Sequence, residues 1–280
     1  MIASAALAKR ALSMFGRVFP RCGMISQAVA YNLFLAFFPT LLIAVGLATS
    51  PVGRRTILFD LIIDFTAFLP PGSQQLVSEF LINRGPQAWK WALVGGVGTL
   101  IAGSQVMRLL MEGIHVIYGD QDRPSFLVRQ CRSVALLLVT IAPLLAAAIL
   151  GVFGRPLRYW GAREFARSPS VQAFWGVFFH GAAIFLAMIS LTVIYRVARP
   201  REASLGNVVP GAMVATLLWW AADVAFGVYV RKVPYSLLYG GLAAVIGLLI
   251  WMQLSTVIIF LGAAWNAELA DSRKEARRHG

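Results

Sequence analysis

Four polar side chains recur along one apolar stretch of the sequence and could act on a charged substrate: Gln105, Arg108, Glu112 and His115. Steps of three, four and three residues place all four on one face of an α-helix. Arg108 and Glu112 also have the spacing of an ion pair. This face predicts either a structural ion pair near the end of a membrane span, or the polar lining of an inner vestibule that meets a charged head group.

Three more polar residues interrupt apolar stretches: Asn32, Asp223 and Gln253. Asn32 precedes a proline in the same stretch, so it could bond to a neighbouring helix or contact a substrate. An aspartate as central as Asp223 must be protonated, paired or exposed to water. It could couple protons, pair with Arg108, or serve the fold. Gln253 is expected to bond inside a bundle, and a place in a substrate pathway is the alternative.

Motifs for common enzyme chemistry are missing from the sequence. It has no phosphate-binding loop, no His-Glu-x-x-His, no Cys-x-x-Cys and no nucleophile elbow. Its 3 histidines and 2 cysteines are dispersed, so they do not have the spacing of a metal site. We therefore expect no metal, no cofactor and no enzyme activity.

The composition is that of a membrane protein. Hydrophobic residues make up 59% of the chain and charged residues only 13%, whereas soluble domains carry about 25% charged residues. A net charge of +13 would suggest nucleic acid in a soluble protein. Here the bases lie between apolar segments, so we expect them to anchor helix ends and to meet anionic lipid head groups, not nucleic acid.

The apolar segments predict an all-α, polytopic membrane protein, because a span needs about 20 apolar residues. A six-helix membrane domain is expected over 26–266, with spans at 26–49, 91–110, 133–153, 172–195, 208–230 and 238–265. Residues 1–25 predict an amphipathic interfacial helix that ends near Pro20. Residues 50–90 predict a helical hairpin that caps the outer face, with a re-entrant segment as the alternative. Residues 267–280 form a basic tail.

Orientation follows from the loops. Lys and Arg are modestly more frequent on the side of the N-terminus, which favours a cytoplasmic location for both ends. Small residues such as Gly95, Thr99 and Gly103 recur at four-residue spacing in the second span, a pattern that favours close helix packing and permits a homodimer.

Several apolar runs are distinctive in combination: Ala28 to Pro39, Pro210 to Ala212, Tyr239 to Ala244, and Leu261 to Leu269. Together they resemble the YihY/BrkB family of bacterial inner-membrane proteins, some of which have carried a ribonuclease label. The chain departs from the family pattern at Ala264, where the family usually has glutamate. The resemblance implies six spans, an inner-membrane location and a link to lipid handling.

The sequence thus favours an inner-membrane transporter or flippase-like protein for an amphipathic, anionic lipid or lipid-linked substrate. In this hypothesis Arg108 contacts the head group, and Asp223 couples or gates the movement. The alternative is a non-transporting scaffold that organises envelope enzymes through its loops and termini.

Overall fold

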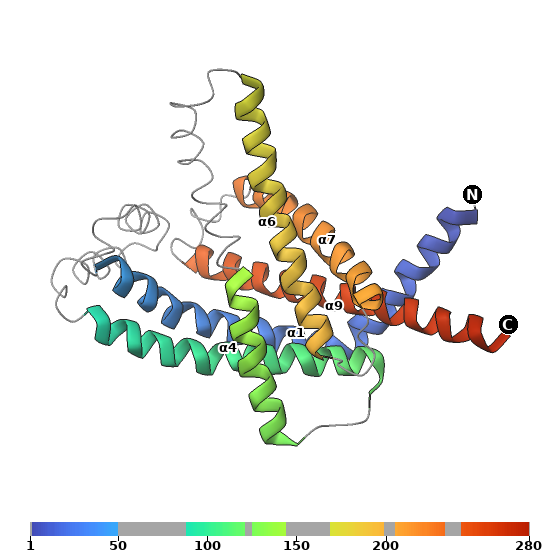
Figure 1. Cartoon of the computed structure of the whole chain (residues 1–280), viewed down its shortest axis with the longest axis horizontal. Coiled ribbons are helices and arrows are strands. Elements are labelled where there is room, and N and C mark those ends of the chain that lie inside the picture. Colours follow the sequence, from blue (N-terminus) through green and yellow to red (C-terminus); the bar gives the residue numbers. More distant parts are fainter. Residues whose placement is uncertain are drawn as a thin grey trace. The chain divides into compact units, whose positions relative to one another are not determined.

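The structure, a computed structural model, describes residues 2–49, 88–120, 125–143, 169–198, 205–232 and 242–279. Nearly all of these residues are helical. The helices are α1 (Ile2–Thr49), α4 (Ala88–Tyr118), α6 (Pro169–Ala198), α7 (Leu205–Lys232) and α9 (Leu242–His279) (Figure 1). A further helix covers Phe126–Pro143. Helices satisfy their own backbone hydrogen bonds, which is what a chain in lipid requires.

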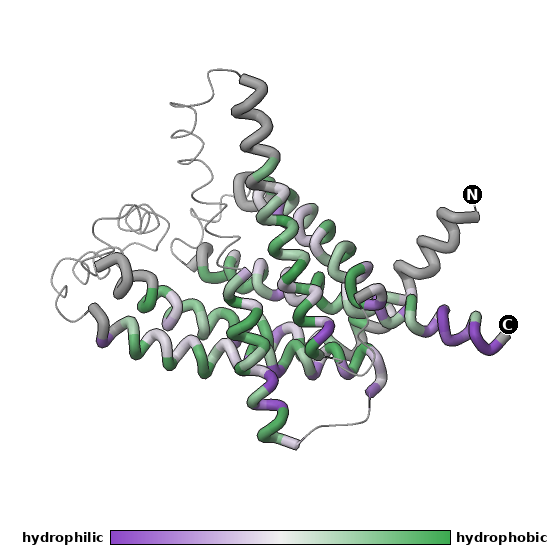
Figure 2. Tube along the Cα trace, viewed as in Figure 1, coloured by the Kyte–Doolittle hydropathy of each residue, from purple (hydrophilic) through white to green (hydrophobic). Residues whose placement is uncertain are grey.

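Six helices in the described part of the chain are long and apolar enough to cross a membrane, which confirms the predicted fold class. The apolar windows are Cys22–Ile43, Ala92–Tyr118, Phe126–Pro143, Gly181–Ala198, Gly206–Val228 and Val245–Arg278. Each overlaps one predicted span. Figure 2 shows that the last helix, α9, changes from hydrophobic to hydrophilic towards its C-terminal end.

Two boundaries differ from the sequence prediction, and one predicted element cannot be compared. The helix expected to end near Pro20 does not end there, because α1 continues without a break to Thr49. Proline removes one backbone donor, and a long helix can tolerate that loss. The third helix begins at Phe126, earlier than the predicted Ser133. The predicted outer cap over 50–90 lies outside the described residues, apart from the first residues of α4.

The chain divides into two compact units. Unit 1 comprises Met1–Gly23, Met111–Trp220 and Val257–Gly280. Its described core includes side chains of α6, α7 and α9, joined by residues of α4 such as Ile114. Phe260 of α9 is fully buried, and its ring fills the space beside Gly113 of α4.

Unit 2 comprises Met24–Leu110 and Ala221–Thr256. Here α1 and α4 run side by side (Figure 1) in very close contact, because a Cβ added to Gly95 would lie 2.6 Å from the carbonyl oxygen of Pro39. The hydroxyls of Thr40 and Thr99 lie 3.3 Å apart across the same pair of helices. Small residues that let backbones approach, with hydroxyl hydrogen bonds beside them, are typical of helix packing in lipid.

Candidate functional site

Arg108 and Gln105 form the polar part of α4 that belongs to unit 2. Both side chains are half-buried. The guanidinium of Arg108 donates a hydrogen bond to Oε1 of Gln105, one turn earlier in the same helix. In the described part of the chain this neutral amide is the one partner of the guanidinium. Arg108 therefore places a positive charge inside a membrane span, and no carboxylate among the described residues binds it.

Glu112 and His115 continue the polar face of α4 in unit 1, and both are half-buried. Nδ1 of His115 lies 2.6 Å from the carbonyl oxygen of Met111. A carbonyl can only accept, so Nδ1 carries a proton and Nε2 is left for another partner. Glu112 makes no hydrogen bond or ion pair with any residue described in the structure. The ion pair that its spacing from Arg108 allowed is not formed.

The other three predicted residues differ in their surroundings. Nδ2 of Asn32 donates to the carbonyl oxygen of Ala28 at 2.8 Å, so this amide bonds within its own helix. Asp223 on α7 and Gln253 on α9 are both exposed, and neither bonds to a residue that the structure describes. No two of the predicted residues that lie on different helices bond to each other: the amide of Asn32 bonds within α1, and Asp223 and Gln253 bond to no described residue.

A polar contact that the sequence analysis did not single out lies in unit 1. The side chain of Asn266 on α9 is only 1% exposed. Its Oδ1 accepts a hydrogen bond from the backbone N–H of Gly211 at 2.7 Å, and its Nδ2 donates to the carbonyl oxygen of Val208 at 3.0 Å. Both partners flank Pro210, which lies inside α7 and disturbs the helical hydrogen bonds around it. We call this arrangement the Asn266 clamp.

The backbones of α7 and α9 touch beside the clamp. A Cβ added to Gly211 would lie 2.1 Å from the carbonyl oxygen of Gly262, and one added to Gly262 would lie 2.4 Å from the hydroxyl of Tyr195. That hydroxyl donates to the carbonyl oxygen of Ile259 at 2.7 Å, which ties α6 to α9. Glycine at both positions is therefore what lets the three helices meet.

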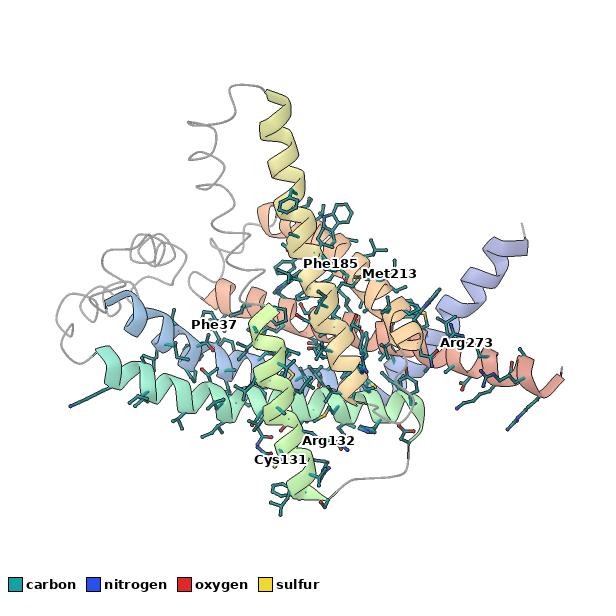
Figure 3. The ribbon with its side chains drawn as sticks, viewed as in Figure 1. Phe37, Cys131, Arg132, Phe185, Met213 and Arg273 are labelled. Atoms are coloured by element: carbon teal, nitrogen blue, oxygen red, sulfur yellow. The ribbon has the colours of Figure 1, made fainter. Side chains whose placement is uncertain are left out.

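Further along α9, a guanidinium adds a bond to α7. Arg273, labelled in Figure 3, donates to Oδ1 of Asn207. The sequence signal for these contacts consists of small residues and one asparagine within apolar runs. The sequence analysis used these runs only as evidence of the family resemblance. Because both polar ends of Asn266 are taken, the clamp holds helices together and offers nothing to a substrate.

Of the predicted residues, three are charged and have no ionic partner among the described residues, so they could act on a ligand: Arg108 and Asp223 in unit 2, and Glu112 in unit 1. No group of three or more His, Cys, Asp or Glu residues that could hold a metal ion occurs among the described residues. In unit 2 the two charges lie on different helices, α4 and α7, and do not pair with each other.

A family model for the virulence factor BrkB matches residues 20–280. The chain belongs to this family. The match covers all six apolar helices, so it confirms the resemblance drawn from the sequence motifs. No solved structure matches the chain.

Named relatives support the same assignment. A Bacillus subtilis protein, YfkH, whose name describes it as ribonuclease-like, is 27% identical over 255 residues, 89% of this chain and 90% of YfkH. A UPF0761 membrane protein of Alkalilimnicola ehrlichii is 26% identical over 257 residues. The match takes in 89% of this chain but 55% of that protein, so the chain spans about half of its length. The UPF0761 membrane protein YihY of Escherichia fergusonii is 26% identical over 215 residues, 75% of this chain and 70% of YihY.

Proposed function

We propose that this BrkB-family protein moves an amphipathic lipid or lipid-linked molecule with an anionic head group across the bacterial inner membrane. The observation that carries the proposal is the state of Arg108, a half-buried guanidinium in a membrane span whose described partner is a neutral amide. A charge in hydrocarbon costs at least a few kcal/mol unless it is compensated. A phosphate or carboxylate that passes the helix would supply this compensation.

The guanidinium suits this task chemically. It stays charged and presents several N–H donors in a plane, which match the oxygens of a phosphate. Gln105 uses one of these donors and fixes the orientation of the group. Glu112 and His115 follow on the same face of α4, at the end that is predicted from the loop charges to face the cytoplasm. A head group would meet this polar face after leaving the inner leaflet.

Transbilayer movement of a labelled lipid tests the proposal directly. The full chain is reconstituted into liposomes with a fluorescent phosphatidylglycerol, and the label on the outer leaflet is quenched with a membrane-impermeant reductant. We expect a second, slower quenching phase that protein-free liposomes lack. We expect Arg108→Gln to slow this phase about tenfold or more, since a charge-assisted hydrogen bond contributes roughly 1.5–3 kcal/mol. Arg108→Lys should retain part of the rate.

Arg277→Gln is the matched control, because Arg277 lies near the C-terminal end of α9 and is exposed. It removes the same charge from the protein and should leave the rate unchanged. The proposal is wrong if no lipid in a panel of head groups moves faster than in protein-free liposomes. Stable complexes with envelope enzymes in that case would favour the scaffold alternative. Equal rates for wild type and Arg108→Gln would remove Arg108 from the pathway.

A further inference from the structure

Asp223 is a carboxyl group in an unusual place. It lies on α7 in unit 2, it is exposed, and it has neither a hydrogen bond nor an ion pair to any described residue. The next residue, Val224, is 51% exposed, and Val228, one turn further on, is 39% exposed. No other aspartate or glutamate lies in the described part of unit 2. A carboxylate on such an apolar face is costly unless a cation joins it.

An aromatic pair lies one turn from this carboxyl group. Phe226 follows Asp223 by three residues and is therefore on a neighbouring part of the same helix face. Its ring lies 5.2 Å from that of Trp251 on α9, with an interplanar angle of 36°. A carboxylate beside aromatic faces is the usual composition of a site for organic ammonium groups, since the faces of aromatic rings, tryptophan above all, attract such cations.

The described basic side chains of this unit do not pair with the carboxyl group of Asp223. The bases of unit 2 whose side chains the structure describes are Lys90 and Arg108, both on α4. Asp223 pairs with neither of them. The described residues of α9 in unit 2, 242–256, contain no ionisable side chain. The missing positive charge is therefore best supplied by a ligand.

We infer that Asp223, together with Phe226 and Trp251, binds the ammonium group of a membrane lipid head group. The inference rests on the proposed function, in which Arg108 meets an anionic phosphate, and it narrows the substrate class to lipids whose head group carries an ammonium group beside that phosphate. Arg108 takes the phosphate, and Asp223 takes the ammonium group, either together or at successive positions of the moving lipid. The affinity for a lipid then depends on whether its head group carries an ammonium group, as well as on the net charge of that head group.

Binding of lipids with identical acyl chains tests the inference. The detergent-solubilised full chain is titrated with phosphatidylethanolamine, phosphatidylcholine and phosphatidylglycerol, and the bound lipid is counted by native mass spectrometry. We expect wild type to bind the two ammonium lipids about tenfold more tightly than phosphatidylglycerol, equivalent to about 1.4 kcal/mol. Asp223→Asn should abolish this preference and leave binding of phosphatidylglycerol unchanged. Asp223→Glu should keep the preference.

Two further variants separate the parts of the site. Trp251→Leu should weaken binding of phosphatidylcholine more than that of phosphatidylethanolamine, because a quaternary ammonium has no N–H to donate and depends more on the aromatic face. Glu275→Gln changes an exposed acid near the C-terminal end of α9 and should change nothing. Each variant is first checked for a wild-type elution volume and thermal unfolding midpoint, so that loss of binding is not loss of fold.

The outcomes decide between several possibilities. Equal affinity of wild type for all three lipids, or an intact preference in Asp223→Asn, overturns the inference. An equal fall in the affinity of Asp223→Asn for all three lipids also overturns the inference. It would point to a role of Asp223 that is common to all head groups, such as proton coupling. If glycerophosphoethanolamine, which has no acyl chains, competes as well as the lipid, the ligand is a soluble ammonium compound and the lipid assignment is wrong.

The inference and the proposed function can fail separately. Preference for ammonium lipids without any lipid movement in liposomes would retain the ammonium site and reject the transport proposal. Movement of lipid without any head-group preference would retain the transport proposal and reject the ammonium site.

Discussion

Two amides on one helix show how differently the same chemical group can be used. Asn266 and Gln253 both lie on α9. The amide of Asn266 is buried and bonds to two backbone groups of α7, whereas the amide of Gln253 is exposed and bonds to no described residue. A polar group in an apolar surrounding costs free energy unless its hydrogen bonds are made. Asn266 should therefore stabilise the fold, and Gln253 should not.

Replacing Asn266 by leucine should lower the stability of the protein in detergent. The N–H of Gly211 and the carbonyl oxygen of Val208 would each lose a hydrogen bond, and a typical intramolecular bond contributes roughly 0.5–1.5 kcal/mol. The measurement is the thermal unfolding midpoint of the purified protein. Gln253→Leu is the matched control on the same helix and should leave the midpoint unchanged or slightly higher. Equal midpoints for the two variants would show that the Asn266 clamp does not stabilise the fold.

The residue scale also shows what a sequence can reveal about single side chains. Asp223 and Arg108 could be selected from the sequence, because a charge in an apolar stretch is conspicuous. The clamp could not, because Asn266 bonds to backbone atoms of α7, 55 and 58 residues earlier, and backbone atoms carry no sequence signal. The exposure of Asp223 was equally hidden, since it depends on which face of α7 the neighbouring helices cover.

At the scale of helices, glycine decides where two backbones can touch. Gly95 and Gly96 are neighbours on α4, yet their surroundings are opposite. A Cβ on Gly95 would lie 2.6 Å from the carbonyl oxygen of Pro39 on α1, whereas a Cβ on Gly96 would meet nothing within 4 Å. The pair therefore offers an internal comparison in which the chemical change is identical and only the contact differs.

Gly95→Ala should destabilise the packing of α1 on α4, since a methyl group forced against a backbone carbonyl costs roughly 1–3 kcal/mol. Gly96→Ala should be neutral or mildly stabilising, because alanine is the better helix former by about 1 kcal/mol. The thermal unfolding midpoints of both purified variants, measured in several detergents, give the difference in stability. A midpoint for Gly95→Ala at or above that of Gly96→Ala would contradict the close approach of the two helices in unit 2.

The same argument applies to α7 and α9 in unit 1. Gly262→Ala would place a methyl group 2.4 Å from the hydroxyl of Tyr195 and 2.6 Å from the carbonyl oxygen of Gly211. We expect a loss of about 1–3 kcal/mol in the free energy of unfolding. Gly247→Ala, on the same helix with nothing within 4 Å, is the control. Wild-type stability of Gly262→Ala would mean that the two helices can separate there without cost.

Helices were the part of the fold that the sequence predicted best. A span is a local property, about 20 apolar residues in a row, so all six were found. Their ends were found less well, because they depend on more than hydropathy. Pro20 indicated an end of helix, yet α1 continues through it. Close packing was indicated correctly on one helix, because the four-residue spacing of Gly95 and Thr99 singled out the face of α4 that meets α1, whereas Gly96, outside this spacing, meets nothing within 4 Å.

At the scale of the whole molecule, orientation in the membrane decides from which leaflet a head group would reach Arg108. The chain is a multi-pass membrane protein, and the loop charges predict that both termini face the cytoplasm. The polar end of α4 and the start of the Phe126–Pro143 helix then face the cytoplasm too. The two cysteines offer a direct test, because Cys131 on that helix is exposed, whereas Cys22 is fully buried with its thiol 3.8 Å from the carbonyl oxygen of Gly113.

A membrane-impermeant maleimide should therefore modify Cys131 from the cytoplasmic side alone. Inverted inner-membrane vesicles should be labelled within minutes, and intact spheroplasts should stay unlabelled until they are permeabilised. Cys131→Ser should abolish the labelling, because burial protects the remaining thiol, and Cys22→Ser should leave it intact. Labelling of intact spheroplasts would reverse the orientation. It would place the polar face of α4 towards the outer leaflet, so that a head group would reach Arg108 from the opposite side of the membrane.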